Sequence, residues 1–327
     1  MSIIEALQTN AVLFYGVVAF MGLFVGSFLN VVIYRLPVMM QNEWRQAMQE
    51  MAAEDAAALA QADQLADSTQ TTGNDNPDEQ QRQLNNAQQE VGGSEQSSSE
   101  TFNLSVPRSR CPSCNNLITW WQNIPVLSYL MLGGKCRNCK SPISARYPII
   151  ELVTMLLSLV VAWQFGPSLQ AVVGILTTWF LVAMSMIDFD HQLLPDQLTL
   201  PLMWIGLLVS LLPVFADVRS AVIGAAAGYL VLWLVFQLFK LITGKEGMGY
   251  GDFKLLAALG ALLGWQQLPM IILLSSLVGA VVGLSLIALA GRDKNIPIPF
   301  GPYLAAAGWI AMLWGEQISS AYMGLFA

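Results

Sequence analysis

Two acidic segments are conspicuous in this apolar sequence because each follows a long apolar run. One is Gly249-Tyr250-Gly251-Asp252, and the other, residues 187–196, contains Asp188. Ionisable groups at membrane depth are costly and usually face a partner or a water-filled cavity. Either segment alone could be an ordinary flexible turn or a helix cap. Together they predict a functional pair of carboxylates.

Two carboxylates held close together cannot both ionise cheaply, so they share one proton. Such a pair can activate water as a base and protonate a carbonyl oxygen or leaving amine as an acid, which is aspartyl-protease chemistry. Asp188 is the preferred partner of Asp252 because it directly ends the apolar run before it, unlike Asp190. Asp196 follows Pro195 and is expected to cap the next helix.

The cysteines form a second constellation. Cys111, Cys114, Cys136 and Cys139 make two Cys-x-x-Cys pairs with twenty-one residues between them, a spacing typical of four-cysteine zinc sites. A four-thiolate zinc has no open position, so we expect a structural role. His191 is the only histidine, so it cannot build a histidine-rich metal site, and we expect it to be an ordinary loop residue.

Composition predicts an all-α integral membrane protein. Of the 327 residues, 55% are hydrophobic and only 11% are charged, against about 25% in soluble domains. The net charge of −7 arises in residues 41–100, which hold twelve acidic residues and two basic ones. The remainder has no strongly basic face, so we expect membrane lipid and no nucleic acid as a partner.

Eight apolar stretches are long enough to suggest about eight transmembrane helices, although 253–265 is short and is expected to enter the bilayer partly or at a tilt. They are residues 11–34, 147–165, 170–187, 198–215, 219–241, 253–265, 268–290 and 301–315. Glycines four residues apart within them predict close helix packing, as at Gly22/Gly26 and Gly224/Gly228.

Composition also divides the chain into four parts. A first transmembrane helix (1–37) precedes an acidic, Gln/Ala/Ser-rich cytoplasmic insertion (38–105), which we expect to be mostly disordered, with a helix from Trp44 to about Leu65. A four-cysteine zinc module (106–146) and a polytopic membrane protease domain (147–327) follow.

The distribution of basic residues predicts the orientation. Fourteen of the fifteen Lys and Arg residues fall on one side of an eight-span arrangement, and only Arg219 falls on the other. Both termini are then outside, while the cysteine module and both aspartate segments face the cytoplasm. The two candidate aspartates therefore share one membrane face, as a catalytic pair requires.

The sequence resembles the bacterial type IV prepilin leader peptidase family, whose members are GxGD aspartyl proteases. The resemblance covers nearly the whole chain outside about 40–100 and depends on several motifs. They are Gly26–Pro37, the two Cys-x-x-Cys pairs with Trp120 and Asn123-Ile124-Pro125 between them, Ala145–Pro148 with Glu151, Ile187-Asp188, Leu194-Pro195-Asp196, Gly249–Lys254 and Ile298–Pro302.

This resemblance implies a function in the bacterial inner membrane, with Asp188 and Asp252 as the catalytic residues. The family removes the short basic leader of type IV prepilins or type II secretion pseudopilins after a glycine, at the cytoplasmic face. Similarity to members with the cysteine module further implies N-methylation of the new N-terminus, with S-adenosylmethionine as donor. Residues 41–100 are a departure from the family pattern.

Two rival functions make different demands on the fold. An ion-coupled transporter would bind a coupling ion at intramembrane aspartates and would be supported by broken helices or an inverted repeat, neither of which is evident apart from the short 253–265 segment. A presenilin-like intramembrane protease shares Gly-x-Gly-Asp but places its aspartates deeper in the bilayer. Here the aspartates flank charged loops.

Overall fold

The computed structural model describes residues 3–68, 103–104, 106, 110–111, 113–118, 126–245, 247–290 and 298–324. The chain divides into two compact units. One comprises Met1–Pro37 and Arg108–Ala327, and the other comprises Val38–Pro107.

Helix α1 (Ile3–Thr9) is followed by the long helix α2 (Ala11–Ser68), which begins in the first unit and continues into the second. The Ala-, Gln- and Glu-rich sequence after Trp44 contains no Pro or Gly before Ser68, so nothing in it interrupts a helix. The helix predicted from Trp44 to about Leu65 is therefore confirmed. Residues 69–102, on which much of the predicted disorder depends, lie outside the described residues.

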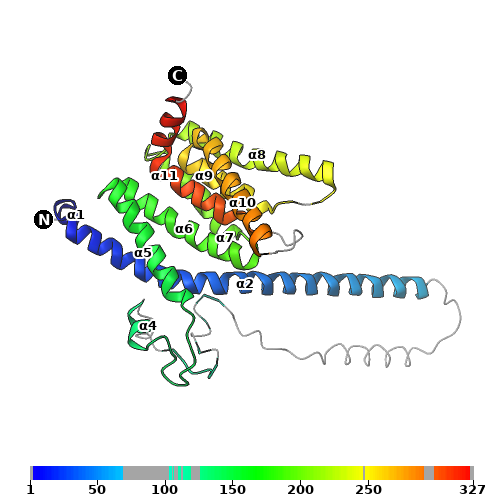
Figure 1. Cartoon of the computed structure of the whole chain (residues 1–327). Helices are drawn as coiled ribbons and strands as arrows, with labels where there is room; N and C mark the ends of the chain where they lie inside the picture. The colour runs from blue at the N-terminus through cyan, green and yellow to red at the C-terminus, as the bar shows by residue number, and fades with distance from the viewer. Residues whose placement is uncertain are drawn as a thin grey trace. The chain divides into compact units, whose positions relative to one another are not determined.

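The rest of the first unit is helical, and the described residues contain only isolated β-bridges and no named strand. Its helices are α4 (Leu127–Met131), α5 (Arg146–Phe165), α6 (Leu169–His191), α7 (Asp196–Val209), α8 (Val218–Thr243), α9 (Tyr250–Leu263), α10 (Leu268–Ala290) and α11 (Gly301–Gly324), with a short 3₁₀ turn, Trp265–Gln267, before α10. Figure 1 shows their arrangement.

Every predicted apolar stretch overlaps one helix, the first of them α2 and the others α5 to α11, and five of the described helices are long and apolar enough to cross a membrane. These are found within α2, α5, α6, α8 and the segment Trp265–Leu286. The all-α membrane class is thus confirmed, and the number of eight spans stays a prediction.

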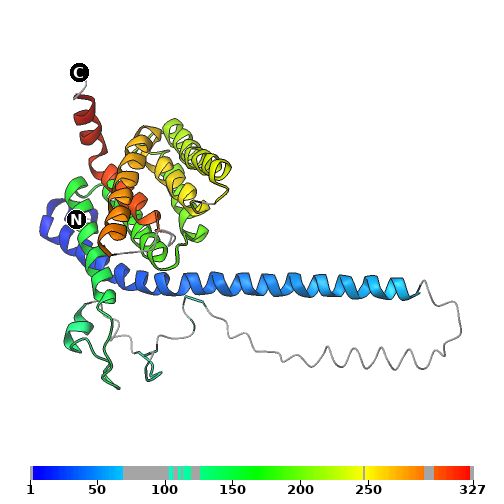
Figure 2. The ribbon, with the colours of Figure 1, turned by 45° about the vertical axis from the view of Figure 1, so that its right-hand side comes forward.

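Helix α9 is the buried centre of the first unit. It packs against α7, α8 and α11, and each residue from Leu255 to Leu263 is buried (Figures 1 and 2). Protein surrounds this helix, so its sequence is apolar on all sides although it has only 14 residues. Its burial explains why the 253–265 stretch is shorter than a typical span.

Glycines bring the helix backbones together, as predicted. Gly224 of α8 contacts Gly260 of α9 directly through the backbone, and a Cβ on Gly228 would lie 2.6 Å from the carbonyl oxygen of Leu256. A Cβ on Gly22 of α2 would similarly lie 2.7 Å from the Cα of Met155 in α5. Helices packed this closely hold their positions without large side chains at the interface.

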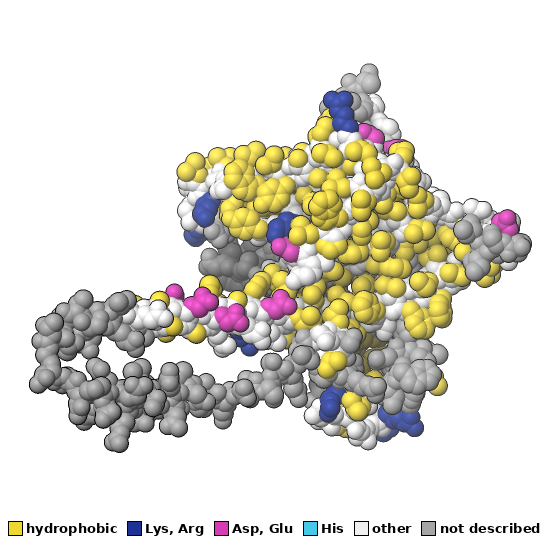
Figure 3. Space-filling model, turned by 180° about the vertical axis from the view of Figure 1, so that it is seen from behind, with side chains coloured by type: hydrophobic (Ala, Val, Ile, Leu, Met, Phe, Trp, Pro, Cys, Tyr) yellow, Lys and Arg dark blue, Asp and Glu magenta, His cyan; other side chains and the backbone are white. Residues whose placement is uncertain are grey.

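Large apolar side chains cover the outer faces of the helices, as the space-filling view shows (Figure 3). Leu208 of α7, Leu234 of α8 and Leu277 of α10 are each about 60% exposed. A surface this apolar is unfavourable in water and favourable in lipid. The outer faces of these helices therefore fit a multi-pass membrane protein.

Candidate active site and cysteine module

The end of α6 positions Asp188. The helix begins at a Ser168 cap, whose side chain accepts a hydrogen bond from the Ala171 N–H, and it ends at His191. Gln192 then adopts a left-handed conformation (φ 53°), and its N–H donates to the Asp188 carbonyl oxygen over 2.8 Å. This turn reverses the chain toward α7 and leaves the Asp188 side chain buried, with 5% of the residue exposed.

The first turn of α9 positions Asp252. Gly249 precedes the helix in an extended conformation, and its carbonyl oxygen accepts a hydrogen bond of 3.3 Å from the Asp252 N–H. Asp252 is buried, with 7% of the residue exposed. Its Oδ1 atom is buried without a hydrogen-bond partner in the described part of the chain. A buried carboxylate oxygen in this state is available to hold a proton, a water molecule or a substrate group.

The structure brings Asp188 and Asp252 together, close enough for their charges to interact. The start of α11 completes the arrangement, because the Gly301 N–H donates to Asp188 Oδ2 over 2.9 Å. Leu194, which is buried, lies against both Gly251 and Gly301. Segments far apart in the sequence therefore converge on one pair of neighbouring carboxylates, which is the arrangement that paired acid–base chemistry requires.

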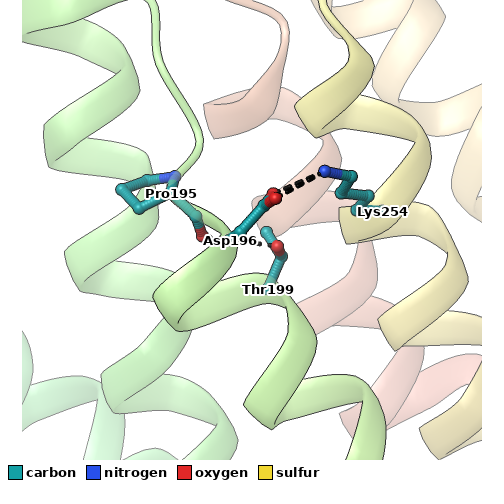
Figure 4. Close-up of polar contacts among 4 residues, drawn as sticks. All are labelled: Pro195, Asp196, Thr199 and Lys254. Atoms are coloured by element: carbon teal, nitrogen blue, oxygen red, sulfur yellow. Dashed lines mark hydrogen bonds and ion pairs between the residues drawn. The ribbon is translucent and has the colours of Figure 1, made fainter. Parts of the chain in front are cut away.

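The competing aspartates have basic partners instead. Asp190 forms an ion pair with Arg146 at the start of α5. Lys254 Nζ donates to both carboxylate oxygens of Asp196, over 2.6 and 2.7 Å (Figure 4). Both aspartates are exposed, whereas Asp188 is not. Their geometry favours Asp188 as the member of the pair.

Two local predictions are wrong. Asp196 does not cap α7: it is the first residue of that helix, the N-cap is Pro195, and the Asp196 carboxylate binds Lys254 across the interface with α9. Asp196 pairs instead with a lysine 58 positions further along the chain, so a tertiary ion pair replaces the local capping interaction. His191 does not lie in a loop, because it is the last residue of α6 and is exposed.

The four cysteines form a cluster that could hold a metal ion. Their Sγ atoms all lie within 4.8 Å of one another, and those of Cys111 and Cys139 are 3.8 Å apart. Tetrahedral coordination with a Zn–S distance of about 2.3 Å separates sulfur atoms by about 3.8 Å. The donor set and its spacing therefore fit zinc.

Two equivalent turns present these thiols. In the first, the Cys111 N–H donates to the Asn116 carbonyl oxygen, and Asn115 has a positive φ of 55°. In the second, the Cys136 N–H donates to the Ser141 carbonyl oxygen, and Lys140 has a positive φ of 59°. The repeated geometry is what a pair of metal-binding knuckles requires.

Hydrogen bonds in these turns favour the thiolate form of Cys111 and Cys139, which is the form that binds zinc. A hydrogen bond with the Asn116 backbone lowers the pKa of the Cys114 thiol, but burial and the side chains of Cys111 and Cys139 outweigh it and raise that pKa. Backbone N–H groups of Cys114 and Ser113 lower the pKa of the Cys111 thiol to about 6. The side chain and backbone N–H of Ser141 lower the pKa of the Cys139 thiol.

The cysteine module is linked to the membrane helices through Glu151 of α5. This buried carboxylate accepts a hydrogen bond of 2.7 Å from the backbone N–H of Val126, which has a positive φ of 52°. Trp120 and Asn123-Ile124-Pro125, which contribute to the resemblance, lie outside the described residues.

Sequence reasoning missed three residues that contact the pair or its supporting segments: Leu194, Lys254 and Gly301. Each belongs to a motif that supports the resemblance, but none was expected to act there. Gly301 acts through its backbone N–H, which has no side-chain signature. The available signal was a glycine directly before a proline at the start of an apolar stretch.

Two family models match the chain: the Bacterial Peptidase A24 N-terminal domain over residues 20–165, and the Type IV leader peptidase family over residues 175–284. Curated relatives described as "Prepilin leader peptidase/N-methyltransferase" cover nearly the whole chain. One from Stutzerimonas stutzeri is 49% identical over 326 residues, 99% of this chain and 98% of the relative. One from Aeromonas hydrophila is 51% identical over 314 residues (96% and 95%), and one from Legionella pneumophila is 42% identical over 310 residues (95% and 94%). No solved structure matches the chain.

The fold and the site together define a multi-pass helical membrane protein with a buried aspartate pair and a four-cysteine module. With relatives this similar over almost its full length, the chain belongs to the type IV leader peptidase family.

Proposed function

We propose that this chain removes the N-terminal leader of type IV prepilins or type II secretion pseudopilins and N-methylates the new N-terminus. The observation that most directly supports the peptidase proposal is the buried pair of Asp188 and Asp252, which lie on α6 and α9 of a chain that belongs to the type IV leader peptidase family. In the described part of the chain, neither aspartate forms a hydrogen bond with a basic side chain, whereas the nearby Asp190 and Asp196 do.

In the proposed mechanism the two carboxylates share one proton. The ionised member accepts a proton from a water molecule as the water oxygen attacks the scissile carbonyl carbon. The protonated member donates to the carbonyl oxygen, and collapse of the resulting tetrahedral species transfers a proton to the leaving amine. Asp252 Oδ1 is available to the water or the carbonyl oxygen, because no group of the described chain occupies it.

We assign methyl transfer to a site other than the aspartate pair. S-adenosylmethionine supplies the methyl group when bound, and the free amine exposed by cleavage accepts it. Because the aspartates act on the peptide bond, their loss leaves methylation of an already cleaved substrate intact.

We further assign structural zinc to Cys111, Cys114, Cys136 and Cys139. The sulfur spacing near that of a tetrahedral thiolate site supports this assignment. A small module with little apolar core gains much of its stability from such a metal. The Glu151–Val126 hydrogen bond would then attach a metal-ordered module to α5.

We place the protein in the bacterial inner membrane, with the active site facing the cytoplasm. The asymmetric distribution of Lys and Arg supports this orientation. We retain the four-part organisation 1–37, 38–105, 106–146 and 147–327, with 106–146 as the zinc module and 147–327 as the protease domain. Prepilin or pseudopilin precursors and membrane lipid are the partners.

The proposal is tested by incubating the purified protein with a pseudopilin precursor and measuring the mass of the product N-terminus. Cleavage after the leader glycine, followed by a mass increase of one methyl group when S-adenosylmethionine is added, is the expected result. A transporter would leave the precursor intact. A presenilin-like protease would cleave within the apolar segment instead of at its cytoplasmic end.

A further inference from the structure

Asp188 lies at the unfavourable end of its own helix for a negative charge. Helix α6 ends at His191, so the Asp188 carboxylate is within the last turn, where the helix dipole is negative. Asp252 has the opposite position, in the first turn of α9, where the dipole favours a carboxylate. Asp188 must therefore obtain its stabilisation from another element.

Helix α11 supplies that stabilisation. Gly301 is the first residue of this helix, which is kinked at Trp314, and its backbone N–H donates to Asp188 Oδ2 over 2.9 Å in a buried environment. The positive end of the α11 dipole and a direct hydrogen bond thus meet at one carboxylate oxygen. The two residues are 113 positions apart in the sequence, so tertiary packing creates the contact.

A side chain fits at position 301 only if the Asp188 carboxylate moves. A Cβ there would lie 2.6 Å from Asp188 Oδ2 and 3.1 Å from Leu194 Cδ1. Leu194 is also held from the other side, because a Cβ on Gly251 would lie 2.6 Å from the Leu194 Cβ. Leu194 therefore separates Gly301 from Gly251, the residue directly before Asp252, and the three residues fix the spacing of the pair.

We propose that Gly301 is a positioning residue for leader removal. Its N–H orients the Asp188 carboxylate toward Asp252 and stabilises the ionised form, and the absence of a side chain permits this contact. The inference rests on the proposed peptidase function of the pair. It also gives the Ile298–Pro302 motif a structural role, because this segment contains Gly301 and so places the first N–H of α11 against Asp188.

The test is Gly301→Ala in the full-length protein, assayed with a pseudopilin precursor. Displacement of the carboxylate by about 1 Å predicts a fall in kcat of about 100-fold, with KM within about threefold of the wild-type value. Methyl transfer to an already cleaved substrate should be unchanged. Gly283→Ala, in α10, is the matched control. A Cβ there would lie 3.2 Å from Cδ1 of Ile298, a residue of the segment that contains Gly301, and it would not contact Asp188. A normal kcat in Gly301→Ala would overturn the inference.

Leu194→Ala added to Gly301→Ala separates carboxylate displacement from crowding. Removing the Leu194 contact should not restore kcat, because the clash with Asp188 Oδ2 remains. Restoration to the level of Leu194→Ala alone would show that Gly301 matters only for packing against Leu194.

If Gly301→Ala folds but is too unstable to assay for cleavage, a double-mutant cycle of thermal stability with Asp188→Ala still decides the question. Removing the carboxylate should remove most of the thermal-stability loss caused by Gly301→Ala, and an equal loss in both backgrounds would refute the contact. Failure of the proposed function has a different signature. In that case wild-type protein does not cleave, or Asp188→Asn cleaves normally, whatever the behaviour of Gly301→Ala.

Discussion

Placing a methyl group on the face where α8 meets α9 should slow leader removal without touching either aspartate. A Cβ at Gly228 would lie 2.6 Å from the carbonyl oxygen of Leu256, whereas ordinary contact begins at 3.4 Å. Gly228→Ala therefore requires a shift of about 0.8 Å between the two helices. Leu256 is one helical turn beyond Asp252, so the shift displaces the Asp252 carboxylate relative to Asp188.

The expected consequences are a loss of kcat and a loss of stability. A displacement approaching 1 Å predicts a decrease in kcat on the order of 10²-fold, and overpacking predicts about 1–3 kcal/mol of destabilisation. Rates are measured by mass analysis of a pseudopilin precursor, and stability by thermal unfolding in detergent. Methyl transfer to a cleaved substrate should continue at the wild-type rate.

Gly16→Ala is the control for this experiment, because nothing lies within 4 Å of a Cβ at that exposed position of α2. Alanine is also the better helix former there, so stability should be unchanged or slightly higher. Cleavage by Gly228→Ala within about threefold of the wild-type rate would show that the shift between α8 and α9 does not reach the Asp252 carboxylate.

Three further outcomes are expected. Purified protein should contain about one zinc ion per chain, and the double substitution Cys111→Ser/Cys114→Ser should lose the metal and make the module protease-sensitive, as metal analysis and limited proteolysis would show. Leader cleavage should partly survive this substitution. Wild-type protein that is isolated without chelator and lacks zinc would contradict the assignment. Lys254→Met should lower the free energy of unfolding by less than about 1 kcal/mol, because the Asp196 side chain is 51% exposed and exposed ion pairs contribute little. A double-mutant cycle with Asp196→Asn measures the interaction energy of the pair. An interaction energy well above that value would contradict this and show that the ion pair is important for the stability of the site. Deleting about residues 50–95 should leave cleavage largely intact, because an acidic segment with few aromatics cannot form a packed site. Loss of cleavage at normal expression would contradict this and identify the segment as a binding site for the substrate or a partner.

The aspartate pair could be foreseen because its cause is local. Asp188 and Asp252 are both ionisable residues next to apolar runs, and the basic residues place both segments on the same side of the predicted membrane arrangement. The cysteine cluster was equally predictable, since the spacing of the four cysteines in the sequence is typical of a zinc site. In both cases side-chain type and spacing carried the information.

The support of the pair could not be foreseen, because it depends on tertiary contacts. Local preference favoured a cap at Asp196, but the approach of α7 to α9 gave its carboxylate Lys254 as a partner. The donor at Gly301 is a backbone group, so residue type alone does not reveal it. Burial of α9 follows from glycine contacts with α8, which the glycine pattern predicted as close packing but without naming the partner helix.

The central claim is that Asp188 and Asp252 act as one water-activating pair, and the most direct measurement is leader removal by Asp188→Asn and Asp252→Asn. Mass analysis of the substrate N-terminus should show a rate loss of at least about 10²-fold in each variant, with methylation of pre-cleaved substrate retained. Glutamate at either position should restore little, since one methylene displaces the carboxylate, and Asp190→Asn should be much milder. Wild-type cleavage rates in either Asn variant, or an inactive Asp190→Asn beside an active Asp188→Asn, would contradict the assigned pair.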